Sequence, residues 1–245
     1  MSHPFFNLFE KLPAIMPVIH LQSCQQARNS VQIAADHNVD GIWLIDHQAR
    51  NPHYLISVYA ELREEFPELW MGTNFLGLHP EDAFELLPET LQGYWSDDFG
   101  LAQALENHVF TEVSSRVCQA QRESGWRGLH FGGMAFKYQR PVPDEALFGL
   151  AKIAGEIVGD LGVITTSGEK TGAAPAIEKV AAIKRGLSEV GPKLPLAIAS
   201  GTDETNIAML AEHVDCFLVA SSITEHQTEL LIPSKLKKLM KAAGR

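Results

Sequence analysis

The sequence repeats one pattern eight times: a short apolar run, a polar or glycine junction, and a longer segment of helical period. The apolar runs begin at Ala14, Gly41, Leu69, Gly93, Gly128, Leu161, Leu194 and Cys216. The helical segments span residues 24–38, 52–66, 80–91, 101–125, 144–159, 174–190, 203–213 and 234–243. Near-continuous apolar strands that alternate with helices are typical of a parallel sheet whose two faces are both buried.

Eight strand–helix units in 245 residues match the count and length of a (β/α)8 TIM barrel. We therefore predict an α/β fold with a single domain over residues 1–245, in which residues 1–13 close the bottom of an eight-stranded parallel barrel. A doubly wound open sheet would give a similar local pattern. The barrel is favoured because no GxGxxG sequence follows the first strand, where a dinucleotide-binding sheet carries it.

Charge and cysteine content narrow the class of protein. The net charge of −10 argues against a broad surface that binds nucleic acid or an anionic membrane. A local anion site is compatible with this charge. No apolar run approaches the roughly 18 residues that a membrane span needs. The three cysteines lie far apart and form no CxxC pair, which indicates reduced thiols and a cytoplasmic protein.

Barrels of this type work at the carboxyl ends of their strands, where this chain carries polar residues. Three successive strands end in Ser, Thr and Gly, and backbone N–H groups at such turns, with the following helix N-terminus, can hold a phosphate group. The alternative is that these are ordinary turns and helix caps. We predict that a small phosphorylated molecule is held by Gly168, Lys170, Gly172, Ser200, Gly201, Ser221 and Ser222, with Asn74 and Lys137 beside them.

Acidic and imidazole side chains at the strand ends are candidates for acid–base catalysis. We predict Asp46, Asp98, His20 and His130 for this role, since a carboxyl group in a barrel mouth can have a raised pKa. The spacing Gly-x-Trp-x-x-Asp occurs at residues 41–46 and again at 93–98 and favours Asp98 over its neighbour Asp97. The tryptophans of this motif, Trp43 and Trp95, are expected to pack between the strands and the helices.

Metal binding is the alternative role of these side chains. His20 and His130, together with Asp46 or His47, are suitable ligands for Zn²⁺. No paired spacing such as HExxH supports a metal, so none is assigned, and no organic cofactor is implied.

Two stretches of the C-terminal half resemble BtpA-family proteins. These are VITTSGEKTGAAPAIEKVAAIKRGL at residues 163–187 and PLAIASGTDETNIAMLAEHVDCFLVASSI at 195–223, and VDGIWLID at 39–46 is similar to the family's second strand. Ser167, Gly168, Thr171 and Gly172 also resemble the sixth loop of the wider ribulose-phosphate-binding barrels. Those barrels usually have glycine where this chain has Ala220. The resemblance implies a TIM-like barrel from a family that includes an assembly factor for a photosynthetic complex.

Two functions follow as expectations. One is an enzyme that acts on a sugar phosphate or phosphoribosyl compound as a lyase, isomerase or transferase. The other is a non-catalytic, BtpA-like assembly protein that keeps a phosphate-binding cup. An exposed apolar patch formed by FFNLF at residues 5–9 would favour a partner surface or a homo-oligomer, whereas a short helix that closes the barrel would not.

Overall fold

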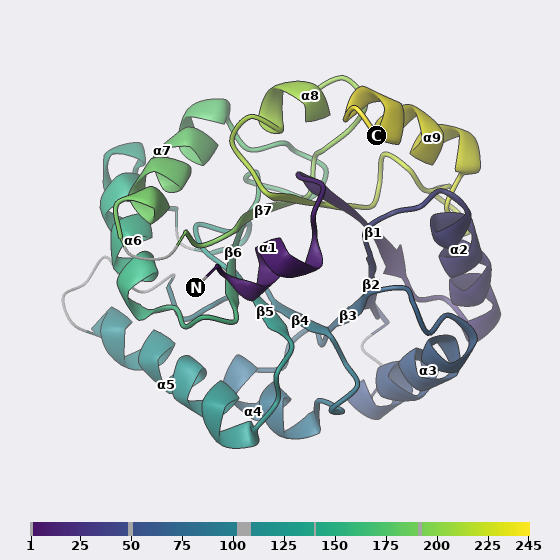
Figure 1. Cartoon of the computed structure of the whole chain (residues 1–245), viewed down its shortest axis with the longest axis horizontal. Coiled ribbons are helices and arrows are strands. Elements are labelled where there is room, and N and C mark those ends of the chain that lie inside the picture. The colour runs from purple at the N-terminus through teal and green to yellow at the C-terminus, as the bar shows by residue number, and fades with distance from the viewer. Residues whose placement is uncertain (1, 49–50, 102–108, 140, 191–192) are drawn as a thin grey trace.

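The eight predicted strands form one closed parallel barrel. The computed structural model describes residues 2–48, 51–101, 109–139, 141–190 and 193–245. The strands are β1 (Ala14–His20), β2 (Ile42–Ile45), β3 (Met71–Asn74), β4 (Gly93–Ser96), β5 (Leu129–Gly133), β6 (Gly162–Thr166), β7 (Leu196–Ala199) and β8 (Cys216–Val219). They pair in sequence order, and β8 pairs with β1, so the prediction of a (β/α)8 barrel is confirmed and an open sheet is excluded (Figure 1).

Helices surround the strands, as Figure 1 shows. They are α2 (Cys24–Asp36), α3 (Pro52–Glu65), α4 (Pro80–Ala83), a 3-10 turn (Phe84–Leu86), α5 (Val109–Ser124), α6 (Asp144–Ile157), α7 (Ile177–Ser188), α8 (Ile207–Leu210) and α9 (Pro233–Ala242). The segments after β3 and β7 form much shorter helices than the sequence predicts. Part of the helical segment predicted at 101–125 lies outside the described residues.

The barrel interior is filled by large aromatic rings. Trp43 lies 4.8 Å from Phe131 and 5.2 Å from Trp70 between ring centroids, and Trp95 belongs to the same buried cluster. A Cβ on Gly72 would lie 2.3 Å from the Trp43 ring, so this strand position has to be glycine for the indole to fit. The expectation that Trp43 and Trp95 pack between strands and helices is therefore wrong, because both side chains point into the barrel.

The short helix α1 (Pro4–Leu8) lies across the barrel at the amino ends of the strands (Figure 1). Phe5 is fully buried, with its ring centroid 6.3 Å from that of Phe131, and Phe9 lies 5.6 Å from Trp70. The FFNLF segment is thus no continuous exposed patch, because two of its three phenylalanine rings complete the barrel interior. Leu8 is the exception, at 54% exposed.

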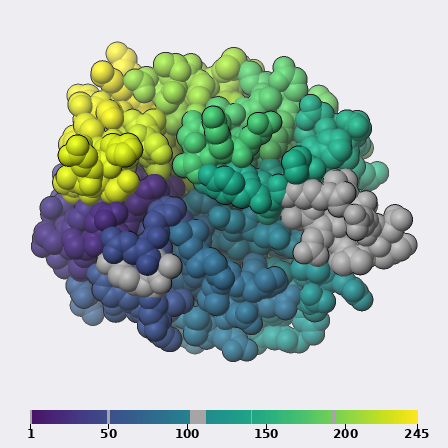
Figure 2. Space-filling model, turned by 180° about the vertical axis from the view of Figure 1, so that it is seen from behind, coloured from purple at the N-terminus to yellow at the C-terminus, as the bar shows by residue number. Residues whose placement is uncertain are grey.

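The opposite face of the molecule carries the loops that follow the strands. Figure 2 shows this face, with the purple segments that follow β1 and β2 beside the yellow segment that follows β8. Among the described residues, no helix is long and apolar enough to cross a membrane.

Candidate functional site

A cavity of about 530 Å³ opens at the carboxyl ends of the strands. Its apolar floor is formed by Val18, Ile45, Trp95 and Leu218, which top the packed barrel interior. Polar residues around the floor come from the ends of every strand except β3, namely His20, His47, Asp97, Lys137, Tyr138, Thr171, Gly172, Ser200, Gly201, Thr202, Asp203, Ser221 and Ser222. A pocket of this size with converging polar groups is suited to a small-molecule ligand.

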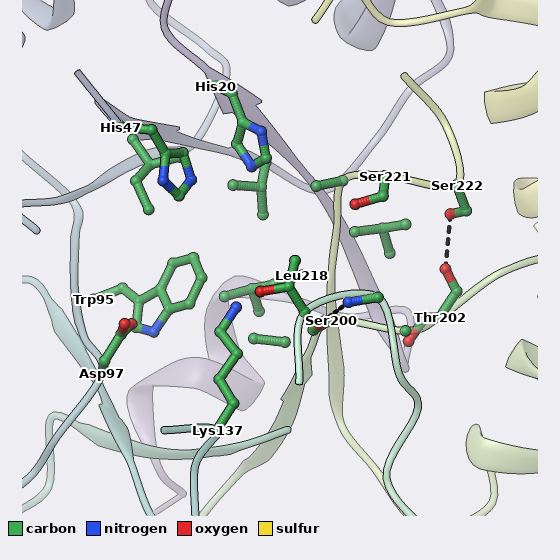
Figure 3. Close-up of a pocket in the computed structure, with 18 of the residues that line it drawn as sticks. His20, His47, Trp95, Asp97, Lys137, Ser200, Thr202, Leu218, Ser221 and Ser222 are labelled. Atoms are coloured by element: carbon green, nitrogen blue, oxygen red, sulfur yellow. Dashed lines mark hydrogen bonds between the residues drawn. The ribbon is translucent and has the colours of Figure 1, made fainter. Parts of the chain in front are cut away.

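One side of the cavity is built from hydroxyl and backbone groups. The Ser200 hydroxyl oxygen accepts a hydrogen bond from the Gly172 N–H at 2.9 Å, and the Ser222 hydroxyl donates to the Thr202 carbonyl at 2.7 Å (Figure 3). The buried Thr202 hydroxyl has no partner among the residues that the structure describes. The N–H groups of Gly201, Thr202, Ser221 and Ser222 also donate to no other described residue. These four N–H groups, on residues that line the cavity, remain available to an anion.

Glycine is required where two of these loops touch. Gly201 has φ +74°, and a Cβ on it would lie 2.1 Å from the backbone of Ala173. Ser200 also has a positive φ, +95°, which is rare for a residue with a side chain. The close approach joins the loops after β6 and β7 into one wall.

Acid–base groups occupy the opposite side of the cavity. In Figure 3, His47 and Asp97 lie across from Ser222 and Thr202, and the Lys137 side chain points into the space between them. Asp97 accepts a hydrogen bond from the Asn74 amide at 3.2 Å. Burial raises the pKa of Asp97, against the lowering effect of Asn74, Lys137 and His47. A carboxyl group with a raised pKa can exchange a proton nearer to neutral pH.

The two histidines of the cavity are in contact. The His20 and His47 rings meet edge to face, with centroids 4.6 Å apart. Burial lowers the pKa of both imidazoles, and the positive charge of Lys137 lowers both further. One ring nitrogen of His20, Nδ1, lies 3.1 Å from a carboxylate oxygen of Glu229 in the loop after β8. At neutral pH these rings are therefore uncharged and able to accept or donate one proton.

Hydrogen bonds to neighbouring segments fix the turn that carries Lys137. Its N–H donates to the Ser167 hydroxyl at 2.8 Å, and the half-buried ammonium of Lys179 donates to the carbonyls of Ala135 and Ser167 at 2.5 and 2.8 Å. On the other side, the Gln139 amide donates to the Asp97 carbonyl at 2.7 Å. The turn that carries Lys137 is thus tied both to β6 and to the end of β4.

Asp46 and Asp98, which the sequence predicts as acid–base residues, do not line this cavity. Strand side chains alternate, so residues two apart share a face. Trp43 and Trp95 point inward, which directs His47 and Asp97 to the cavity. An aspartate three residues after each tryptophan faces the other way.

Asp46 instead accepts a hydrogen bond from the Gln48 N–H at 3.0 Å and is 5% exposed. The Asp98 carboxylate accepts a hydrogen bond from the Gly100 N–H at 2.8 Å. Both carboxylates therefore shape the loops that follow their strands.

His130 also lies outside the cavity, because it points from β5 toward the helices. Its ring is fully buried and stacks between Tyr94 and Phe99, at centroid distances of 5.3 and 4.6 Å. Nε2 lies 2.8 Å from the Ser96 hydroxyl, which itself donates to the Asp98 carbonyl, so Nε2 carries the proton. Burial lowers the pKa of His130 to about 3. His130 therefore supports the fold, and the structure places this predicted catalytic residue outside the cavity.

This buried imidazole makes the stability of the protein pH-dependent. The unfolded chain binds a proton at His130 below pH 6.5, whereas the folded chain resists it down to about pH 3. The contribution of neutral His130 to the free energy of unfolding is complete above pH 6.5 and is lost as the pH falls toward 3. His130→Phe should therefore make the free energy of unfolding less dependent on pH between 6 and 4, by about 1.4 kcal/mol per pH unit. Urea unfolding at several pH values measures this slope, and equal slopes in both proteins would contradict it.

The remaining predicted residues divide into two groups. Those that line the cavity are His20, Lys137, Gly172, Ser200, Gly201, Ser221 and Ser222. Those that do not are Asn74, which reaches the site through Asp97, and Gly168 and Lys170 of the loop after β6. A Cβ on Gly168 would lie 2.2 Å from the Ala173 carbonyl oxygen, so its role is close backbone packing. Lys170 is exposed.

Thr202 and Glu229 were not considered as site residues, whereas His47 was considered as an alternative metal ligand and Asp97 as the alternative to Asp98. Alternation counted from the inward-facing tryptophans would have found His47 and Asp97. No local signal marks Glu229. Across the described parts of the chain, no three His, Cys, Asp or Glu side chains are grouped so that they could hold a metal ion.

Comparison with known proteins identifies the fold. The chain is similar to (S)-3-O-geranylgeranylglyceryl phosphate synthase from Thermoplasma acidophilum in complex with sn-glycerol-1-phosphate, with TM-score 0.68, 11% identity, and 99% and 98% of the two chains covered. It is similar to KGPDC from Streptococcus mutans, with TM-score 0.63, 10% identity, and 96% and 99% covered.

N-(5'-phosphoribosyl)anthranilate isomerase from Pyrococcus furiosus gives TM-score 0.60 at 12% identity, with 94% and 98% covered. No protein-family model matches the chain, and no curated protein matches it. The resemblance to the BtpA family therefore stays a prediction. At these identities the similarity establishes that the chain has the complete (β/α)8 barrel of these proteins.

Proposed function

We propose that this protein is an enzyme that binds a small phosphorylated metabolite and moves a proton on it. The observation that carries the proposal is the division of one cavity into two chemically different sides. Unpartnered N–H groups from the described loops after β7 and β8 lie on one side, and His47 and Asp97 lie on the other. Lys137 points between them (Figure 3).

The donor side suits the phosphate group. A phosphate oxygen accepts several hydrogen bonds at once, and neutral backbone donors at strand ends bind it without a matching cation. Gly172, Ser200, Gly201, Ser221 and Ser222 are the residues we assign to it. One of the similar structures was determined with its substrate sn-glycerol-1-phosphate, so a ligand of this class suits a barrel of the same fold.

The opposite side suits the reacting carbon atoms of such a ligand. Neutral imidazoles and a carboxyl group with a raised pKa can accept or donate a proton, and the Lys137 ammonium can stabilise negative charge that develops on an oxygen. This arrangement supports an isomerase, lyase or transferase. A non-catalytic assembly protein that keeps the phosphate cup would have no use for these groups, and it predicts ligand binding without turnover.

A thermal-shift screen tests the binding step. Phosphate, sugar phosphates and phosphoribosyl compounds are added at millimolar concentration, with and without EDTA. A ligand at about 100 times its dissociation constant adds about 2.7 kcal/mol of stability, which corresponds to a shift of roughly 5–10 °C for a chain of this size. No shift with any phosphorylated compound would remove the proposal.

Substitution of one hydroxyl identifies the site of binding. Ser221→Asp should abolish the ligand-induced shift, because a carboxylate among the anion donors repels phosphate. Ser57→Asp on the exposed face of α3 is the matched control and should keep the full shift. If Ser221→Asp binds the ligand as well as the unaltered protein does, the phosphate lies elsewhere.

A further inference from the structure

The loop after β8 forms a compact hairpin that presents one carboxylate to the cavity wall. An antiparallel bridge joins Thr224 to Leu231, and the Glu229 N–H donates to the Glu225 carbonyl at 2.9 Å. Glu229 has φ +54°, a conformation that is rare for residues with side chains and costs energy. Such a conformation persists only where surrounding contacts hold it, and those contacts point to a function.

Helix α2 supplies the contact that holds Glu229. The side-chain amide of Gln26, buried near the start of this helix, donates to the Glu229 carbonyl at 2.8 Å. The Gln26 amide oxygen in turn accepts a hydrogen bond from the Gln22 N–H at 3.2 Å. The chain after β1 and the loop after β8 are thereby joined, and the Glu229 carboxylate is fixed toward β1.

The carboxylate meets His20. Glu229 Oε2 lies 3.1 Å from His20 Nδ1, while the His47 ring packs edge to face against the same imidazole. An ionised carboxylate can only accept hydrogen bonds, so Nδ1 has to carry the proton of the neutral ring. The other nitrogen, Nε2, then has a free electron pair. His20 lines the cavity and Glu229 does not.

We propose that Glu229 is a positioning residue that fixes His20 as the Nδ1–H tautomer, so that Nε2 is the proton acceptor of the cavity. The catalytic part of this inference rests on the proposed function. Nε2 takes a proton from a C–H or O–H group of the substrate, whose bonding electron pair stays on the substrate. The imidazolium, stabilised by the Glu229 charge, then returns a proton to another atom of the same substrate, and no further reactant is consumed.

The tautomer can be observed without a substrate. Long-range ¹H–¹⁵N correlation spectra of the full chain labelled at histidine, assigned with His20→Gln, should show His20 protonated at Nδ1 at pH 7.5. In Glu229→Gln the signal should move toward the Nε2–H form, because a glutamine amide can donate to Nδ1. Glu225→Gln, in the same hairpin, is the matched control for charge and should leave the tautomer unchanged.

The outcomes separate this inference from the proposed function. An unchanged tautomer in a folded Glu229→Gln protein, or an Nε2–H form in the unaltered chain, overturns the role of Glu229 whatever the cavity binds. If the tautomer shifts as expected but no phosphorylated compound stabilises the protein, the proposed function fails and the His20–Glu229 pair stands. With a substrate in hand, Glu229→Gln should lower kcat about 100-fold with little change in KM, and Glu229→Asp should restore part of the loss.

Discussion

Asp97→Asn is expected to lower kcat by about 10²–10⁴-fold, the usual contribution of a positioned acid–base group. Asparagine has the shape of the carboxyl group and can still accept the hydrogen bond from Asn74, so the surrounding structure should be kept. What is lost is the exchangeable proton on a group whose pKa is raised by burial. Steady-state kinetics on a compound from the thermal-shift screen measures the effect.

Asp98→Asn is the matched control, because it makes the same chemical change one residue away. The Asp98 carboxylate accepts a hydrogen bond from the Gly100 N–H, which an asparagine oxygen can also accept. This variant should keep kcat within a few-fold, and both variants should show the same ligand-induced thermal shift. Equal activity in Asp97→Asn and the unaltered protein would remove Asp97 from the mechanism.

Trp43→Ala is expected to lower the free energy of unfolding by about 3–5 kcal/mol, the cost of truncating a buried large aromatic side chain. Trp43 is fully buried and packs against Trp70, Trp95 and Phe131, so alanine would leave a cavity that the barrel strands are unable to close. Its indole N–H has no partner among the described residues, so the loss is one of packing alone. Urea unfolding measures it.

Met209→Ala provides the comparison. Met209 is 54% exposed on the short helix α8, and its truncation should change the free energy of unfolding by less than about 0.5 kcal/mol. A loss of similar size in the two variants would contradict the assignment of the tryptophans to the barrel interior.

The fold could be predicted because each unit of the chain carries its own signal. Apolar runs of four to seven residues, each followed by a helical segment, determine the strand order of a barrel once right-handed crossovers are assumed. The lengths of α4 and α8 were overestimated because helical periodicity does not show where a tertiary contact ends a helix. Seven of the residues predicted for the site do line the cavity, because the carboxyl ends of all barrel strands converge at one face.

The Gly-x-Trp-x-x-Asp motif alone could not predict which side chains at the strand ends point into the cavity. The Gly-x-Trp-x-x-Asp spacing drew attention to Asp46 and Asp98, but a one-residue change of position reverses the face of a strand side chain. Buried strands lack the alternation of polar and apolar residues that would reveal the inward face. Glu229 lies 209 positions from His20 along the chain, so its contact follows only from the closed barrel.

The aromatic side chains inside the barrel determine how a ligand can reach the cavity. Trp43, Trp70 and Phe131 occupy the space beneath the cavity floor, and Phe5 and Phe9 close it from below. Among the described residues, these packed rings therefore close the cavity toward the amino ends of the strands. In the proposed enzyme, substrate and product would both pass through the mouth at the carboxyl ends of the strands. The product of the proposed reaction should therefore compete with the substrate for the same cavity.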